Sequence, residues 1–332
     1  MADIHPKKIL EINNLQTYFF SSEGTAKAVD GTSFSLTQGQ ILGVVGESGC
    51  GKSVTAQSVM RLVPSPPGRT VGGEILFDGQ DLTTLSMAEM RHIRGNRISM
   101  IFQEPMTSLN PVFTVGNQLS EMFILHRGMN KKDALDASIE MLTKVQIPAP
   151  EARVREYPHQ LSGGMRQRVM IAMALSCEPE VLIADEPTTA LDVTVQAQIL
   201  DLIITLKDDF GTAVEIITHD LGVIAETADS IVVMYAGKVV EQADTIELFE
   251  NTLHPYTRGL LNSTPILGRR TAGTFERLNE IQGMVPSLYN LPEGCKFCER
   301  CPESMAICAQ EEPELTKTDA SHAVRCWLHI PH

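Results

Sequence analysis

The sequence of 332 residues lacks long hydrophobic runs and an excess of basic residues, and both shortages narrow the classes of protein to consider. No uninterrupted apolar segment approaches the roughly 18 residues that a membrane-spanning helix needs. The first residues, MADIHPKKILEI, lack the apolar centre of a signal peptide. The formal net charge of −14 argues against nucleic-acid binding through a broad basic face. We therefore expect a cytoplasmic protein that meets a membrane only through a partner.

Cysteine is scarce over most of the chain and then concentrated near its end. Only Cys50 and Cys177 precede residue 295, whereas five cysteines lie between residues 295 and 326. In a cytosolic chain such a cluster points to metal binding rather than to disulfides. The length suits more than one domain, and 43% hydrophobic with 20% charged residues is typical of a globular protein. The sequence thus predicts a metal-bearing C-terminal extension over residues 246–332.

Strand-like and helical segments alternate through residues 1–245, which predicts an α/β domain with a mainly parallel sheet and helices on both faces. From Thr114 to about Val145 the apolar residues fall at helical spacing with no strand between them, which predicts a helical insertion over about residues 104–165. After Gln242, prolines and polar turns replace the alternation. The expected strands are 41–45, 73–77, 98–102, 181–184 and one ending at Thr218, and the expected helices begin at Gly163, at Val193 and at Lys52, the last ending near Leu62.

The segment GESGCGKS, Gly46 to Ser53, follows an expected strand, precedes a helix and matches the phosphate-binding loop G-x-x-x-x-G-K-[ST]. Lys52 is suited to bridge the outer phosphate oxygens, and Ser53 to hold Mg²⁺. Because a nearby lysine and a helix start lower a thiol pKa, we expect alkylation of Cys50 to block ATP hydrolysis and MgATP to protect it. The residues expected to contact ATP here are Gly46, Ser48, Gly49, Cys50, Gly51, Lys52, Ser53 and Val54.

Two further segments complete the expected chemistry. VLIADEP, residues 181–187, is an apolar strand that ends in Asp185, suited to the Mg²⁺ shell, and Glu186, suited to polarise the attacking water as general base. LSGGM, residues 161–165, opens a helix whose N–H groups form a second anion-binding element; its phosphate-contacting residues are Ser162, Gly163 and Gly164. One ATP hardly needs both elements within one subunit, so LSGGM predicts a site shared with another chain.

The order of phosphate loop, glutamine after a strand, LSGG, Asp-Glu and histidine resembles the ATPase subunit of ABC transporters over about residues 9–242. The resemblance implies a P-loop ATPase core, mainly parallel with an antiparallel β element, and a head-to-tail dimer with composite ATP sites. It assigns Gln103 to metal and water, Asp192 to the loop between subunits and His219 to the γ-phosphate. Phe19, or alternatively Tyr18, is expected to stack on adenine.

Three strings, HPYTRGLL at residues 254–261, EYPHQLSGGMRQR and FQEPMTSLNP, resemble the peptide and nickel importer subgroup of that family. The resemblance implies ATP-driven uptake of di- or oligopeptides. Its implied partners are a second, related ATPase subunit, two membrane permeases that hold this chain at the cytoplasmic face, and an extracytoplasmic binding protein. Nickel import is the alternative. A soluble ABC ATPase of repair or translation is a third reading, although Lys52 and Asp185 lie too close for a coiled-coil arm and the chain holds one cassette.

The cysteine cluster allows two sets of four ligands. Cys295, Cys298, Cys301 and Cys308 have the spacing of a bacterial ferredoxin. Cys295, Cys301, Cys308 and Cys326 match the subgroup, in which a four-iron, four-sulfur cluster is recognised, and we favour this set with Cys298 as a spare neighbour. Four thiolates suit either Zn²⁺ or iron and sulfide. We expect the group to staple the extension, with redox sensing or metal-responsive regulation as alternatives.

Two residues depart from the expected patterns. Met165 stands where many ABC proteins have glutamine, a change that is common in the subgroup. Glu215 lies inside an otherwise apolar strand, where an unpaired carboxylate is costly. The sequence offers no functional account of Glu215.

Overall fold

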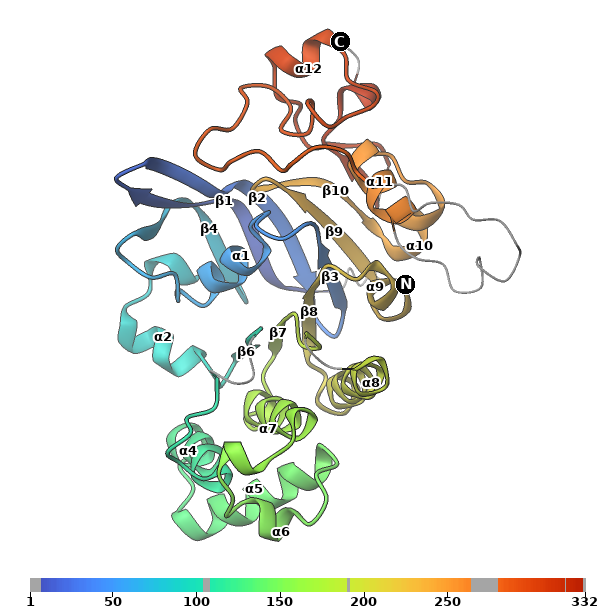
Figure 1. Ribbon diagram of the computed structural model, residues 1–332. Helices are drawn as coiled ribbons and strands as arrows, with labels where there is room; N and C mark the ends of the chain where they lie inside the picture. The colour runs from blue at the N-terminus through green and yellow to red at the C-terminus, as the bar shows by residue number, and fades with distance from the viewer. Residues whose placement is uncertain (1–6, 104–107, 190–191, 264–279, 320, 331–332) are drawn as a thin grey trace, which may run out of the picture. The chain divides into compact units, whose positions relative to one another are not determined.

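The computed structural model describes residues 7–103, 108–189, 192–263, 280–319 and 321–330 (Figure 1). The chain divides into two compact units, each assembled from separate stretches of sequence. No helix among the described residues is long and apolar enough to cross a membrane. Unit 1 comprises residues 1–10, 35–41 and 76–217, and unit 2 comprises residues 11–34, 42–75 and 218–332.

Three fully buried strands form the core of unit 1. They are β6 (Ile98–Ile101), β7 (Val181–Asp185) and β8 (Ala213–Thr218), and β7 pairs in parallel with both neighbours. Continuous burial of this kind is typical of parallel strands covered on both faces. Since carboxyl ends of parallel strands share one edge, residues that follow β6 and β7 are brought to that edge.

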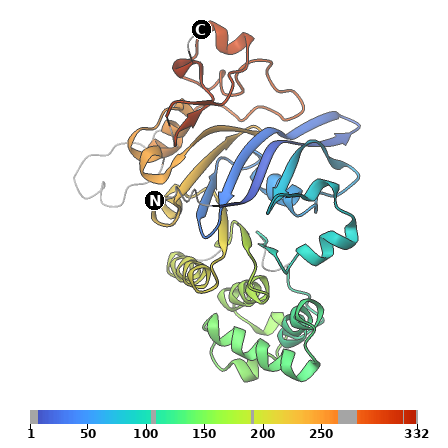
Figure 2. The ribbon, with the colours of Figure 1, turned by 180° about the vertical axis from the view of Figure 1, so that it is seen from behind.

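Helices make up most of the rest of unit 1. In the region of the expected helical insertion, α4, α5 and α6 gather near α7, as the green ribbon in Figures 1 and 2 shows from two sides. Residues 104–107, at the start of the expected insertion, lie outside the described residues. The elements are β5 (Gln80–Asp81), the 3₁₀ turn Leu82–Thr84, α2 (Met87–Ile93), α4 (Val115–Arg127), α5 (Lys131–Lys144), α6 (Pro150–Arg153), the 3₁₀ turn Pro158–Gln160, α7 (Gly163–Leu175) and α8 (Val193–Phe210).

Unit 2 contains strands from both ends of the chain. In one sheet the order is β11-β12-β10-β9-β3, where β3 and β9 pair in parallel and the other pairs are antiparallel. Most of β2, β1 and β4, adjacent in that order, form a second sheet. The strands are β1 (Lys8–Ser21), β2 (Gly24–Thr37), β3 (Ile41–Val45), β4 (Gly68–Phe77), β9 (Ser230–Tyr235), β10 (Lys238–Asp244), β11 (Thr316–Lys317) and β12 (Ala323–Val324).

The helix from Lys52 is shorter than the sequence predicts. It ends at Val59 rather than near Leu62 because Arg61 has a φ of 49°, a left-handed conformation that stops a helix. The expected strand at 73–77 in turn begins earlier, at Gly68. The helices of unit 2 are α1 (Lys52–Val59), α9 (Leu221–Thr227), α10 (Thr245–Glu250), α11 (Pro255–Ser263), α12 (Ala306–Gln310) and the 3₁₀ turn Trp327–His329.

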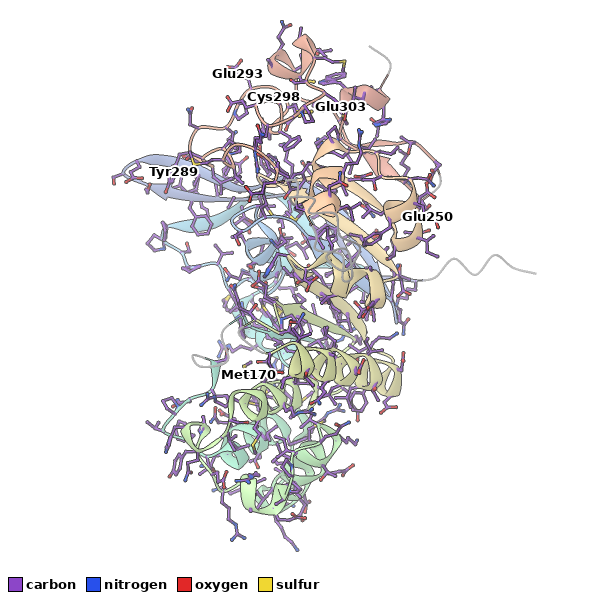
Figure 3. All side chains as sticks on the ribbon, turned by 45° about the vertical axis from the view of Figure 1, so that its right-hand side comes forward. Met170, Glu250, Tyr289, Glu293, Cys298 and Glu303 are labelled. Carbon is purple, nitrogen blue, oxygen red and sulfur yellow. The ribbon has the colours of Figure 1, made fainter. Side chains whose placement is uncertain are left out.

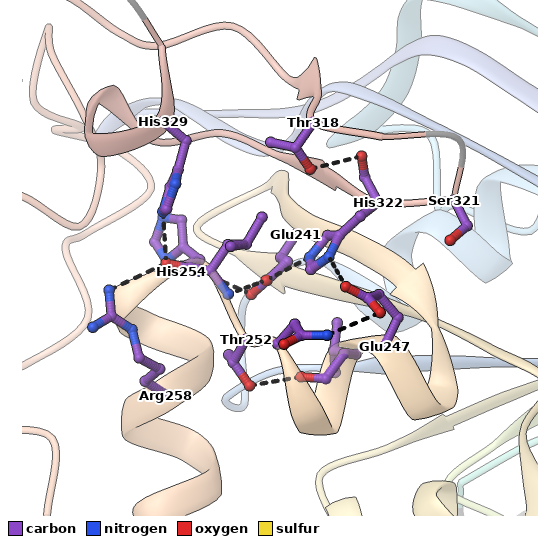
Figure 4. A network of polar contacts seen from close by, with 12 residues as sticks. Glu241, Glu247, Thr252, His254, Arg258, Thr318, Ser321, His322 and His329 are labelled. Carbon is purple, nitrogen blue, oxygen red and sulfur yellow. Dashed lines mark hydrogen bonds and ion pairs between the residues drawn. The ribbon is translucent and has the colours of Figure 1, made fainter.

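The C-terminal residues are joined to β10 by a buried polar network (Figure 4). The fully buried carboxylate of Glu241 accepts hydrogen bonds from the backbone N–H groups of Leu253 at 2.7 Å and His254 at 3.1 Å, and contacts Nε2 of His322 at 2.9 Å. Burial opposes ionisation of Glu241, but these hydrogen bonds outweigh it and hold its pKa below the usual range. One charged group of β10 thus connects two distant segments of the chain.

Candidate active site

The loop between β3 and α1 has a backbone that only glycine fits at two positions. Gly46 and Gly51 have φ values of 153° and 105°. A Cβ on Gly46 would lie 2.2 Å from the carbonyl oxygen of Met234, and one on Gly51 would lie 2.3 Å from that of Ala28. Ser48 and Gly49 are exposed at the tip of the loop. The loop has the tight backbone that the phosphate-binding motif requires.

The Lys52 side chain folds back over this loop. Its ammonium donates hydrogen bonds to the carbonyl oxygens of Gly46 at 2.6 Å and Glu47 at 3.2 Å, and the residue is 5% exposed. Ser53 and Val54 are half-buried in the first turn of α1. The cation is therefore held beside the backbone that is expected to receive phosphate.

The expectation that the Cys50 thiol has a lowered pKa is wrong, and the effect of its alkylation on ATP hydrolysis stays a prediction. Its thiol lies 3.8 Å from the Lys52 ammonium, as the sequence suggests, but the residue is fully buried. Burial raises the pKa of the Cys50 thiol, and the opposing effect of Lys52 is smaller. Cys177 is also buried, and burial raises its pKa as well.

In unit 1, Gln103 and Glu186 meet beyond the ends of β6 and β7. Nε2 of Gln103 donates a hydrogen bond of 2.8 Å to Oε2 of Glu186, and the same oxygen accepts one of 2.9 Å from the Thr189 hydroxyl. The backbone of Glu186 has a φ of 47° and donates to the carbonyl oxygen of Ile217 at 2.9 Å. Such left-handed conformations in non-glycine residues cluster at functional sites. Asp185, the last residue of β7, is 3% exposed.

The second anion-binding element lies at the start of α7. Ser162 is the N-cap, and its hydroxyl accepts the Met165 backbone N–H at 3.3 Å. Ser162 and Gly163 are exposed. Gly164 packs close to Val195: a Cβ added to Gly164 would lie 3.2 Å from the Val195 side chain.

Asp192 lies beside this element, at the start of the neighbouring helix. It caps α8 by accepting the Val195 backbone N–H at 3.0 Å, and the structure places it at the exposed end of that helix. Residues 190 and 191, which precede it in the motif, lie outside the described residues. Unit 1 thus presents the LSGG turn and the Asp192 helix start next to each other.

The remaining predicted ATP contacts belong to unit 2. His219 directly follows β8 and is exposed. Phe19 is half-buried in β1, and its ring packs beside Gly68, where an added Cβ would approach it to 2.8 Å. The Tyr18 hydroxyl instead donates to Asp30 at 2.5 Å. The adenine contact by Phe19 stays a prediction.

Glu215 is fully buried in β8, and neither carboxyl oxygen has a hydrogen-bond partner among the described residues. It pairs in register with Ile183, so its side chain and that of Asp185, two residues further along β7, share one face of the sheet. Burial, and then the charge of Asp185, raise the pKa of Glu215 to about 8. The carboxyl group is therefore largely protonated at neutral pH.

The five C-terminal cysteines gather in unit 2, and all five are free thiols. The backbone N–H of Cys295 donates to the carbonyl oxygen of Cys308 at 2.8 Å, which joins the two ends of the loop. Figure 3 shows Cys298 on this loop, between Glu293 and Glu303. Burial, with the charge of neighbouring cysteines as a smaller cause, raises the pKa of Cys295 to about 12 and that of Cys326 to about 11.

Sequence reasoning missed the contacts that bind the C-terminal segment to the phosphate loop. Arg300 forms an ion pair with Glu47, at 2.6 Å between Nη1 and Oε2, and the Tyr256 hydroxyl accepts the backbone N–H of Glu47 at 2.9 Å. Tyr256 lies within the string HPYTRGLL, but nothing in the sequence connects it to a loop more than 200 residues earlier.

Comparison with known proteins places this arrangement in a family. The profile of the ABC transporter family matches residues 29–189, and the profile described as oligopeptide/dipeptide transporter, C-terminal region, matches residues 240–308. A probable peptide ABC transporter ATP-binding protein, y4tR of Sinorhizobium fredii, is 54% identical over 96% of this chain and 94% of its own length. The oligopeptide transport ATP-binding protein AppD of Bacillus subtilis is 51% identical over 97% of each chain.

Solved structures agree with this assignment. A dimeric ATP-binding cassette, MJ0796, bound to ADP and phosphate matches 71% of this chain and 98% of its own with a TM-score of 0.64 and 27% identity. CbiO1 from Clostridium perfringens, part of an ABC transporter complex, matches 74% of this chain and 91% of its own with a TM-score of 0.61 and 27% identity. The chain therefore has the ABC ATPase fold and belongs to the ABC transporter family, among the ATP-binding subunits of its oligopeptide and dipeptide subgroup.

Proposed function

We propose that this chain hydrolyses ATP to drive the import of di- or oligopeptides, and that Glu186 is the general base. The observation that carries the catalytic assignment is the pair of hydrogen bonds by which Gln103 and Thr189 fix the Glu186 carboxylate. A fixed carboxylate after a buried strand is suited to orient and deprotonate water. Relatives over the whole chain that are described as peptide, oligopeptide and dipeptide transport proteins support peptide rather than nickel as the substrate.

The other site residues have separate roles in this proposal. Lys52 and the loop N–H groups bind the phosphates, His219 contacts the γ-phosphate, and Phe19 stacks on adenine. Ser53, Gln103 and Asp185 would hold Mg²⁺, whose charge would offset that of the phosphates. These three side chains offer the hard oxygen ligands that Mg²⁺ prefers, and donation of Nε2 to Glu186 leaves the Gln103 amide oxygen for the metal.

The assembly we propose is a dimer of ATPase subunits bound to two permeases at the cytoplasmic face of the membrane. Ser162, Gly163 and Gly164 would contact the nucleotide held by the second ATPase subunit, a related chain, and Asp192 would lie at that interface. The exposure of Ser162 and Gly163 supports this arrangement, as does the dimeric form of the solved cassette. An extracytoplasmic binding protein would deliver the peptide.

Transport by the reconstituted complex tests the proposed substrate. The chain would be purified with its permeases and second ATPase subunit, placed in liposomes and supplied with MgATP, the binding protein and a labelled dipeptide or pentapeptide. We expect ATP-dependent peptide uptake that nickel does not compete for. ATP-dependent accumulation of nickel in place of both peptides would contradict the assignment.

We further propose that Cys295, Cys301, Cys308 and Cys326 hold a four-iron, four-sulfur cluster. Buried thiols that raise one another's pKa resist ionisation, and a bound metal group reverses this by supplying positive charge. Among the described residues, no three of these sulfur atoms lie within 4.8 Å of one another. Four thiolates also suit Zn²⁺, so metal analysis decides between the two groups.

Metal analysis after anaerobic purification checks this assignment. We expect about four iron and four sulfide per chain, and loss of most of both when Cys308 is replaced by serine, because Cys308 is buried among the other thiols. Cys298→Ser is the matched control and should retain both. Zinc without sulfide in the wild-type chain would exclude the cluster.

A further inference from the structure

The first variable residue of the phosphate loop, Glu47, is held by a guanidinium from the C-terminal segment. Nη1 of Arg300 lies 2.6 Å from Oε2 of Glu47, and Nη2 lies 3.0 Å from Oε1. This two-point geometry is the strongest form of an Arg–carboxylate contact. The Arg300 side chain is 5% exposed and that of Glu47 is 29% exposed, so water screens the pair only partly.

The remaining donors of Arg300 are also used, which fixes the guanidinium. Nε donates to the carbonyl oxygen of Gln282 at 3.1 Å, Nη2 to that of Ile281 at 3.3 Å, and Nη1 to the Tyr235 hydroxyl at 3.3 Å. Hydrogen bonding to Glu47 is the largest cause that raises the pKa of Arg300 above its usual value. Arg300 is therefore a fixed, permanently charged group.

The C-terminal segment also holds the backbone of Glu47. The Tyr256 hydroxyl accepts the Glu47 N–H, and the Tyr256 ring is fully buried. It packs against the rings of Tyr235 and Phe297, with centroids 4.7 Å and 5.4 Å away. Phe297 and Arg300 both lie in the cysteine loop, the segment 295–308 whose ends are joined by the Cys295–Cys308 hydrogen bond. The aromatic cluster, through Tyr256, and Arg300 therefore both hold Glu47 of the phosphate loop.

The negative charge of Glu47 opposes the binding of phosphate by this loop. Four phosphate charges are expected at its N–H groups, and a bare carboxylate in the same loop would repel them. On its other side Glu47 is fixed by Lys52, whose ammonium bonds to the carbonyl oxygens of Gly46 and Glu47. The Arg300 charge offsets that of Glu47 and leaves the Lys52 charge for the nucleotide.

We propose that Arg300 is a positioning residue of the phosphate loop, which holds Glu47 in place and neutralises it so that the loop binds ATP tightly. The inference rests on the proposed function, because it assumes that this loop binds ATP. Because Arg300 lies between Cys298 and Cys301, the cysteine loop would then contribute to nucleotide binding.

Nucleotide binding by the full-length chain tests the inference. A fluorescent ATP analogue would be titrated, with Mg²⁺, against the wild type and four variants: Arg300→Gln, Glu47→Gln, the double variant, and Arg258→Gln. We expect Arg300→Gln to weaken binding about tenfold, the scale of one charge-assisted hydrogen-bonded pair. Arg258→Gln is the matched control, because Arg258 forms an exposed ion pair with Glu303 at 2.9 Å in the same region, and it should bind within about twofold of the wild type.

The double variant separates positioning from damage to the fold. If Arg300 acts by offsetting the Glu47 charge, removing that charge in Glu47→Gln/Arg300→Gln restores most of the lost affinity. Affinity that stays as weak as in Arg300→Gln, or an Arg300→Gln variant that binds like the wild type, would overturn the inference. A wild-type chain that fails to bind the analogue would instead overturn the proposed ATPase function.

Discussion

Replacing Glu186 by glutamine is expected to lower ATP turnover by a factor of about 10² to 10⁴, the usual contribution of a general base. The amide has nearly the same shape as the carboxylate, and its oxygen can still accept the hydrogen bonds from Gln103 and Thr189. The site should therefore keep its geometry and its affinity for MgATP while losing the group that takes the proton.

Two measurements are needed to read this variant. Phosphate release gives the turnover of the complex, and titration of a fluorescent ATP analogue gives the affinity. Glu250→Gln is the control, because Glu250 is exposed on α10 (Figure 3) and should leave both values unchanged. Near-normal turnover by Glu186→Gln would show that another group is the base, whereas loss of binding would show that the substitution disturbed the site.

Replacing Glu215 by leucine is expected to stabilise the protein and to change how its stability depends on pH. In the unfolded chain Glu215 titrates near 4.5, whereas in the folded chain its pKa is about 8. Between these values the folded state keeps a proton that the unfolded state has lost. Stability therefore falls as pH rises from about 4.5 to about 8, by about 1.4 kcal/mol per pH unit, and this slope is absent in Glu215→Leu.

Urea unfolding at two pH values measures the effect. Relative to the wild type, Glu215→Leu should gain about 2 kcal/mol between pH 6 and pH 8, because the slope flattens as the pH nears the folded pKa. Glu215→Gln is the matched control: it removes the titration but leaves a buried polar group without a partner, so it should lose the pH slope and remain less stable than Glu215→Leu. Equal pH slopes for the wild type and Glu215→Leu would show that the carboxyl group is ionised in the folded chain.

The sequence predicts most of the helices and strands, for a physical reason. The apolar run 181–184 and the helical spacing of apolar residues in α4 and α5 reflect which side chains are buried. Such patterns depend on local sequence alone, so they can be recognised without the structure. Gln103 and Glu186 each follow a strand of one parallel sheet, and their side chains form a hydrogen bond. The roles of both residues in catalysis stay a prediction.

Properties set by distant neighbours are not predictable in this way. The motif around Cys50 suggests a low thiol pKa, but burial by the folded chain decides it, and the motif carries no record of that burial. The same holds for the Arg300–Glu47 pair, whose members are 253 residues apart. Glu215 is partly predictable: the sequence shows a carboxylate inside an apolar strand, whereas its raised pKa depends on the packing around it.

The pairing of β12 with β10 affects how the C-terminal extension can be studied. The two strands pair at Glu241 and Gln242, so a chain cut after Gln242 would end within β10 and lose the strand beside it. The exposed N–H and C=O groups of β10 would then be open to pairing with other molecules, and such bare strands promote aggregation. The Glu241 carboxylate would also lose His322 and both backbone donors. A truncated chain would therefore confound loss of the extension with exposure of β10, so point substitutions are the better measure of how the extension influences ATP binding and hydrolysis.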